Sequence, residues 1–81
     1  MKNTRMYKCN DFYQAVVIKT AGLPLIRLER VSGRFFNFVF DDPDNKAEEI
    51  IAKYWRGEMH VDAKKFVENI DEFKSRIHSG V

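Results

Sequence analysis

The sequence lacks the features that would assign it to a secreted or membrane protein class. Cys9 is the only cysteine, so the chain cannot form an internal disulfide, and an oxidising compartment is not indicated. The first residues contain no apolar run typical of a signal peptide. No stretch approaches the roughly 20 apolar residues that cross a bilayer. We therefore expect a soluble, cytoplasmic protein that does not bind membranes.

Motifs that carry catalysis are also missing. The sequence contains no Walker loop, no GxGxxG and no GxSxG, and its four glycines stand alone at positions 22, 33, 57 and 80. His60 and His78 are the only histidines, and together with Cys9 they lack the close pairing of zinc ligands. We predict that the protein is not an enzyme and has no catalytic, cofactor or metal site.

The densest acidic cluster comprises Asp41, Asp42 and Asp44. Carboxylates this close together can hold Mg²⁺ or Ca²⁺, but the twelve-residue loop of an EF-hand is absent. Asp42 can instead cap a helix that opens at Pro43, and Asp44 suits the positive end of that helix dipole. We therefore interpret the cluster as a helix start.

The composition is that of one small globular domain. A chain of 81 residues buries only roughly 60–65% of its unfolded surface, so its core needs large side chains. Seven Phe, three Tyr and one Trp supply them. We expect a single domain over residues 1–81, with residues 1–8 forming a basic, flexible arm.

Charge is unevenly distributed along the chain. Residues 1–40 carry seven Lys or Arg against two Asp or Glu, whereas residues 41–81 carry seven against ten. A basic half favours an anionic partner such as nucleic acid. The alternative is a dipolar surface that helps solubility or self-association, and we prefer it.

Residues 10–22 predict a helix, although Val16, Val17 and Ile18 are β-branched and would also suit a strand. A helical stripe, in which apolar residues recur three and four positions apart, runs through this segment. Asn10 or Asp11 can cap its start, and Gly22 can follow its last turn. The stripe comprises Tyr13, Val16, Val17, Thr20 and Ala21.

Residues 24–40 predict a β-hairpin. A two-residue turn at Ser32-Gly33 would mix polar and apolar side chains on both faces of the hairpin. A three-residue loop over residues 31–33 uses Gly33 at its left-handed position and separates the polar side chains from the apolar ones. This register pairs Leu28 with Phe36 and Ile26 with Phe38.

The same register assigns each residue of the hairpin to a face. The apolar face comprises Pro24, Ile26, Leu28, Phe36, Phe38 and Phe40. The opposite face is only partly apolar and comprises Leu25, Arg27, Glu29, Phe35, Asn37 and Val39.

Two further helices follow the hairpin. The first is predicted from Pro43 to the terminating Gly57, with a wide apolar stripe. The second is capped by Asp62 and ends before Gly80. The sequence therefore predicts an α+β fold in the order αββαα, in which a two-stranded antiparallel hairpin packs against helices. The two stripes comprise Ala47, Ile50, Ile51, Tyr54 and Trp55, then Phe66, Ile70, Phe73 and Ile77.

The favoured function is a non-enzymatic binding module that contacts a protein partner or a second copy of itself. Its candidate contacts are the aromatic residues that we expect at the surface, Phe35, Tyr54 and Trp55. The alternative is an accessory nucleic-acid-binding protein that combines stacking on Phe35 with phosphate contacts. The candidate nucleic-acid contacts are Lys2, Arg5, Lys8, Arg27, Arg30 and Arg34.

The chain resembles a family of small uncharacterised domains from Gram-positive bacteria and their phages, which is catalogued as a domain of unknown function. The resemblance is carried by residues 38–42 (FVFDD), by residues 54–58 (YWRGE) and by Val61-Asp62, and runs from about Tyr7 to Ser79. It implies a helix over residues 10–22 and a bacterial or phage setting. It supplies no catalytic or binding residue.

Overall fold

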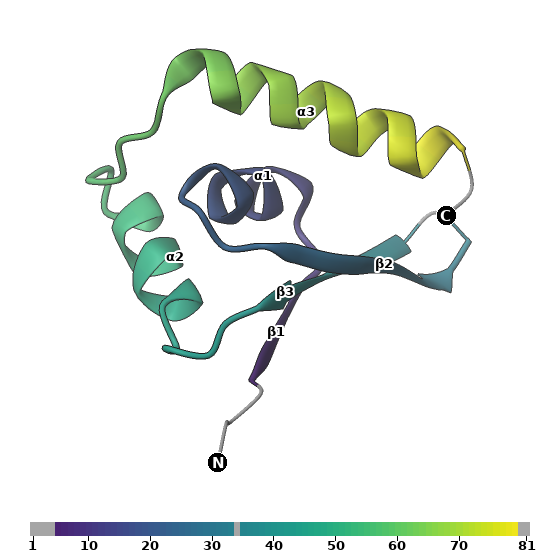
Figure 1. The fold of residues 1–81 in the computed structure, drawn as a ribbon, viewed down its shortest axis with the longest axis horizontal. Helices are drawn as coiled ribbons and strands as arrows, with labels where there is room; N and C mark the ends of the chain where they lie inside the picture. The colour runs from purple at the N-terminus through teal and green to yellow at the C-terminus, as the bar shows by residue number, and fades with distance from the viewer. Residues whose placement is uncertain (1–4, 34, 80–81) are drawn as a thin grey trace.

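A three-stranded antiparallel sheet and three helices make up the computed structural model, which describes residues 5–33 and 35–79. Strand β3 is central and is flanked by β1 and β2. Helices α1 and α3 lie on one side of the sheet and α2 lies beside its end (Figure 1). No helix within these residues is long and apolar enough to cross a membrane. The elements are β1 (Met6–Cys9), α1 (Phe12–Thr20), β2 (Leu25–Ser32), β3 (Phe35–Asp41), α2 (Ala47–Trp55) and α3 (Ala63–His78).

The predicted α+β class is confirmed, but the predicted order αββαα and the two-stranded hairpin are wrong because they omit β1. Residues 6–8, assigned to a flexible arm, belong to this strand, which pairs antiparallel with β3. The amide of Asp42 also donates to the carbonyl of Arg5 at 2.8 Å and extends the pairing by one bond. A strand of four residues carries little local signal, so it forms only because the edge of β3 is available.

Helix α1 is confirmed with both of its predicted end signals. The Asp11 carboxylate accepts a hydrogen bond from the amide of Gln14 at 2.9 Å, and Gly22 adopts a φ of 117°. The helix connects β1 to β2 across the sheet and is buried on most of its circumference. Tyr13 was predicted in the buried stripe but is 53% exposed. The buried side chains are Ala15, Val16, Val17 and Ile18.

The predicted hairpin exists, but its register is displaced by two residues. Leu28 pairs with Phe38 and not with Phe36, and the last pair before the turn joins Ser32 to Phe35. The three-residue loop is therefore wrong, although Gly33 does adopt the left-handed conformation, with a φ of 51°. A shift of two residues preserves the face of each side chain. The predicted burial of the three phenylalanines Phe36, Phe38 and Phe40 is accordingly confirmed.

The displacement originates at the turn, where the pair of Ser32 with Phe35 is three residues from the predicted register, and two β-bulges in β2 then reduce it to two and to one. One extra residue, Ile26, lies between the pairs formed by Leu25 and Arg27, and a second, Val31, lies between those formed by Arg30 and Ser32. Each bulge places two residues of β2 opposite one residue of β3. The first bulge turns Leu25 toward Phe40 and leaves Ile26 44% exposed, which reverses the faces predicted for this pair.

Helix α3 follows its predicted cap, whereas α2 begins four residues late, at Ala47 instead of Pro43, and has Lys46 instead of the predicted Asp42 at its N-cap position. Residues 42–45 form a turn closed by a hydrogen bond from the amide of Asn45 to the carbonyl of Asp42, and Asn45 has a φ of 56°. The Asp42 carboxylate still accepts hydrogen bonds from the first amides of the helix. Asp62 caps α3 through the amide of Lys65 at 2.9 Å. Gly80 lies outside the described residues.

The core is centred on aromatic rings between the sheet and α3. The rings of Phe38 and Phe73 stack with their centroids 5.2 Å apart and an interplanar angle of 18°. Phe12, at the start of α1, meets both rings edge-on at 6.2 and 6.3 Å. This contact joins the first helix, the central strand and the last helix, so one cluster holds the domain together.

Candidate interaction surface

Among the residues that the structure describes, no helix lies over the side of the sheet that faces away from α1 and α3 (Figure 1). Successive residues of a strand point to opposite sides, so β3 directs alternate residues toward this side. Phe35 is 67% exposed there and Asn37 is half-buried. We call this side the outer sheet face. It comprises Met6, Lys8, Arg27, Glu29, Ser32, Phe35, Asn37, Val39 and Asp41.

An ion-pair network crosses the centre of the outer sheet face. Glu29 contacts Arg27 at 2.7 Å between Oε2 and Nη2, and Lys8 at 3.4 Å between Oε1 and Nζ. Lys8 and Arg27 are the residues paired with Val39 on its two sides. Their aliphatic stems flank this valine, which explains why it is fully buried on an otherwise open face.

These two cations also stabilise the ionised form of Glu29. A hydrogen bond from Arg27, reinforced by Lys8, lowers the pKa of the Glu29 carboxyl below its ordinary value. The centre of the face carries one fixed negative charge between two positive ones.

Exposed apolar side chains surround this charged centre. Met6 is 49% exposed at the start of β1, and Phe35 lies beside the hairpin turn. The two bulge residues, Ile26 and Val31, are 44% and 60% exposed and lie next to Arg27 and Ser32 of this face. The resulting surface mixes apolar and charged groups.

The three predicted partner contacts do not form one patch. Phe35 belongs to the outer sheet face, whereas Tyr54 and Trp55 lie at the end of α2. Trp55 is 71% exposed, and its ring meets that of Tyr54 edge-on at 5.5 Å. Trp55 is the last residue of α2 and lies at the surface, as expected for a candidate contact. Residues Met6, Ile26 and Val31 were missed, because neither β1 nor the bulges could be seen in the sequence.

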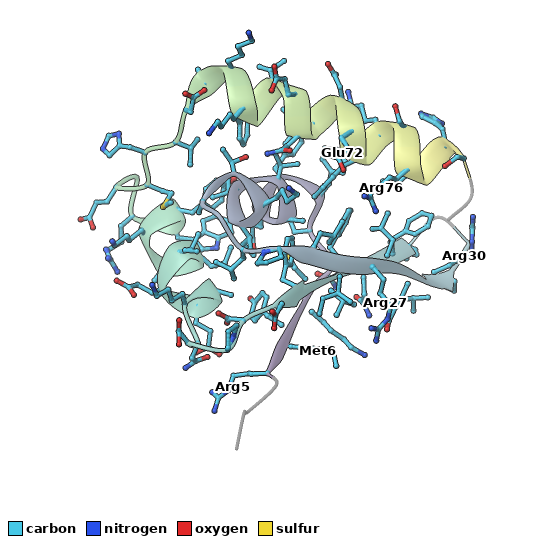
Figure 2. All side chains as sticks on the ribbon, viewed as in Figure 1. Arg5, Met6, Arg27, Arg30, Glu72 and Arg76 are labelled. Atoms are coloured by element: carbon cyan, nitrogen blue, oxygen red, sulfur yellow. The ribbon has the colours of Figure 1, made fainter. Side chains whose placement is uncertain are left out.

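The predicted basic contacts are also separated. Lys8 and Arg27 share the outer sheet face and are both engaged by Glu29. Arg30 turns to the opposite side of the sheet, where its guanidinium lies 4.9 Å from the centre of the Phe36 ring and donates to the carbonyl of Gly33. Figure 2 shows Arg5, Arg27 and Arg30 well apart from one another. Lys2 and Arg34 lie outside the described residues.

In the acidic cluster at the start of α2, the carboxylate of Asp42 binds backbone amides. The buried carboxylate of Asp42 accepts from the amide of Lys46 at 2.7 Å and from that of Ala47 at 3.1 Å. It adjoins a hollow of about 300 Å³ between the α1–β2 connection and α2, and a second hollow of about 280 Å³ follows along α2. Ala21, Leu23 and Lys46 line both hollows. Capping therefore accounts for the carboxylate of Asp42.

The remaining reactive groups lie apart from each other. Cys9 is buried between strand and helix, and burial raises the pKa of its thiol, so the reactive thiolate is disfavoured. His60 and His78 are both exposed. Within residues 5–33 and 35–79, no three His, Cys, Asp or Glu side chains gather closely enough to hold a metal ion.

Comparison with known proteins identifies a family. The sequence model of the family described as Domain of unknown function (DUF5659) matches residues 4–79. This match covers almost the whole chain and confirms the resemblance inferred from the capping and aromatic residues. Comparison with curated proteins and with solved structures finds no match.

Proposed function

Since this chain belongs to the DUF5659 family of domains of unknown function, we propose its function from the geometry of the outer sheet face. The domain is a non-enzymatic binding module, and this face is the surface through which it contacts a protein partner or a second copy of itself. The bacterial or phage setting and the cytoplasmic location belong to the same proposal. They rest on the family resemblance and on the single cysteine.

The observation that carries the proposal is the mixed character of an uncovered face. Protein interfaces combine apolar anchors with a minority of placed charges, and they favour aromatic side chains and Met. The outer sheet face offers Phe35 and Met6 as anchors, with the Glu29 network between them. The exposure of Phe35 and Met6 on one face that no described helix covers, with exposed bulge residues beside it, supports a contact surface.

Nucleic acid is the second candidate, and one observation favours it. Phe35 is exposed on the same face as Lys8 and Arg27, which is the combination that stacks on bases and contacts phosphates. Both cations already share Glu29, so a phosphate would have to compete with that carboxylate. We therefore rank it below protein contact.

Fluorescence anisotropy of labelled single- and double-stranded oligonucleotides separates the two candidates. A nucleic-acid binder loses affinity steeply between about 50 and 200 mM salt, because counterions are released on binding. We expect no saturable binding at either concentration. Saturable binding that falls with salt and is abolished by Arg27→Glu would replace our proposal with the second candidate.

Site-specific photo-crosslinking tests the proposed contact surface itself. A photoreactive phenylalanine analogue in place of Phe35 should form discrete crosslinks to protein in the native cells. The matched control is the same analogue in place of Val67, which is 55% exposed on α3 and belongs to the helical side. Crosslinks from both positions alike, or from neither, would show that the outer sheet face is not the contact surface.

A further inference from the structure

We infer that the free edge of β1 pairs with the same edge of a second copy of this chain, so that the two three-stranded sheets join into one continuous sheet. The contact is made by the backbone edge of the strand and not by the outer sheet face, so this inference goes beyond the proposed function. It follows from the direction in which the backbone groups of β1 point.

A hydrogen bond at the start of β1 determines which of its backbone groups point away from the sheet. The amide of Asp42 donates to the carbonyl of Arg5 at 2.8 Å, so these two residues form a hydrogen-bonded pair. Hydrogen-bonded and non-hydrogen-bonded pairs alternate along an antiparallel ladder. Tyr7 is therefore the next residue bonded to β3, and the amides and carbonyls of Met6 and Lys8 point outward.

The opposite side of β3 gives the same assignment. The amide of Asp41 donates to the carbonyl of Pro24, next to β2, at 2.9 Å. Asp41 is the partner of Met6 in β1, so its amide is used on the side of β2 and is not bonded to Met6. Among the residues that the structure describes, β1 has a strand on one side only, and no backbone group bonds to the outward groups of Met6 and Lys8.

The edge of β1 is regular, whereas the opposite edge of the sheet is not. All four residues of β1 pair with β3 in unbroken register. The β2 edge is interrupted by the bulges at Ile26 and Val31, and only residues 27–30 between them pair without a break. Bulges bend an edge strand and hinder the addition of another strand. The edge of β1 is therefore the one to which a further strand can add.

Two copies of this edge are complementary to each other. A two-fold axis perpendicular to the sheet at Tyr7 sets the two β1 strands antiparallel and places Met6 of each copy opposite Lys8 of the other. The amide and carbonyl of Met6 then bond to those of Lys8 across the axis, so every outward group of both residues is used. A contact around a two-fold axis requires such a match, because both copies offer the same groups.

The charge of Lys8 selects this register over its neighbour. An axis at Lys8 would place the two lysines directly opposite each other, and like charges in that position are destabilising. The axis at Tyr7 instead sets each Lys8 beside the exposed side chain of Met6, where its aliphatic stem can cover the methionine. Its ammonium keeps its contact of 3.4 Å with Glu29 of its own chain.

The same axis leaves the other surfaces of each copy free. A rotation about an axis perpendicular to the sheet keeps both outer sheet faces on one side and the helices α1 and α3 of both copies on the other. The outer sheet face therefore stays open for the partner proposed above. One strand of four residues from each copy buries far less than the about 800 Å² per partner of a standard interface, so the dimer should be weak and reversible.

A disulfide trap on the whole chain tests this register. The Cα atoms of a hydrogen-bonded antiparallel pair are about 5.5 Å apart, within the range of about 4.4–6.8 Å that a disulfide bridges. Met6→Cys in one chain and Lys8→Cys in another should therefore form a linked heterodimer when they are mixed with oxidised glutathione. Each variant alone should stay unlinked, because identical positions lie about 8 Å apart in this register. The buried Cys9 is common to all samples.

A proline substitution tests the pairing without a new cysteine. Lys8→Pro removes an amide that does not bond to β3, so the variant should fold and lose the dimer that sedimentation equilibrium detects at about 500 μM. Arg30→Pro is the matched control at the edge of β2. The amide of Arg30 also points outward, since its partner Phe36 lies an odd number of positions from Asp41. This control should dimerise like the unaltered chain, and circular dichroism checks that both variants fold.

The outcomes separate this inference from the proposed function. Cysteine variants that stay unlinked when mixed, or that link equally fast alone, overturn the edge pairing, and crosslinking from Phe35 still tests the outer sheet face independently. A Lys8→Pro variant that dimerises like the unaltered chain overturns the pairing as well. A Lys8→Pro variant that fails to fold does so too, because the amide of Lys8 would then be needed within the domain.

Discussion

The two faces of β3 show how one strand supplies both the core and the candidate interface. Phe38, on the inner face, is 2% exposed and stacks on Phe73 of α3, whereas Phe35, on the outer face, is 67% exposed. The residues are of the same type and lie three positions apart. Because this separation is an odd number of positions, the two side chains point to opposite sides of the sheet. One side chain holds the fold together, and the other is available to a partner.

Truncation of the inner face should have the largest effect on stability. Phe38→Ala removes a fully packed ring and the stack with Phe73, so we expect a loss of about 3–5 kcal/mol in the free energy of unfolding. Urea denaturation followed by circular dichroism measures it. A loss below about 1 kcal/mol would show that the aromatic cluster is not the centre of the core.

Removal of the buried cap at the end of β3 should come next. Asp42→Ala leaves the amides of Lys46 and Ala47 without their acceptor, at a cost of about 1–3 kcal/mol. Asp62→Ala, a cap exposed to water at the start of α3, is the control and should cost about 1 kcal/mol or less. Equal losses in urea titrations would contradict the special role of the buried carboxylate.

Truncation of the outer face, unlike that of the inner face, should affect association and leave stability nearly unchanged. Phe35→Ala should change the free energy of unfolding by less than about 0.5 kcal/mol, because the ring is mostly in solvent. The same variant should weaken contact with the partner proposed for this face, and Phe35→Asp should abolish it. Urea titration, paired with photo-crosslinking from the neighbouring position of Ser32, separates the two properties. A large loss of stability without loss of association would remove the distinction between the faces.

The smallest effect concerns the acid side of the stability profile. The pKa of Glu29 is lowered in the folded state, so its ion pairs stabilise the protein above the unfolded value, near 4.5, and this contribution disappears as pH falls through the folded pKa. Glu29→Gln should therefore be slightly less stable than the unaltered chain at pH 7 and equal to it at pH 2. A difference that persists at the lower pH would have another cause.

Local signals in the sequence predicted much of the fold. Asp11, Asp62 and Gly22 mark their helix ends correctly, because capping depends on a few neighbouring residues. The burial of alternate phenylalanines in β3 was also predicted, because alternation survives a register shift of two residues. These features depend on short-range chemistry.

The features that the sequence did not reveal depend on long-range pairing. Strand β1 forms against residues 29 to 35 positions away, and nothing in its four residues requires it. The bulges at Ile26 and Val31 arise from matching two strands of different length to one turn. The outer sheet face includes residues from β1, so the aromatic prediction found only Phe35 of its apolar anchors.

The most direct test is the pair of photo-crosslinking experiments with the phenylalanine analogue at Phe35 and at Val67. We predict discrete crosslinks to protein from Phe35, on the outer sheet face, and none from Val67, on α3. Crosslinks from both positions alike, or from neither, would contradict the assignment of the outer sheet face as the contact surface of the domain.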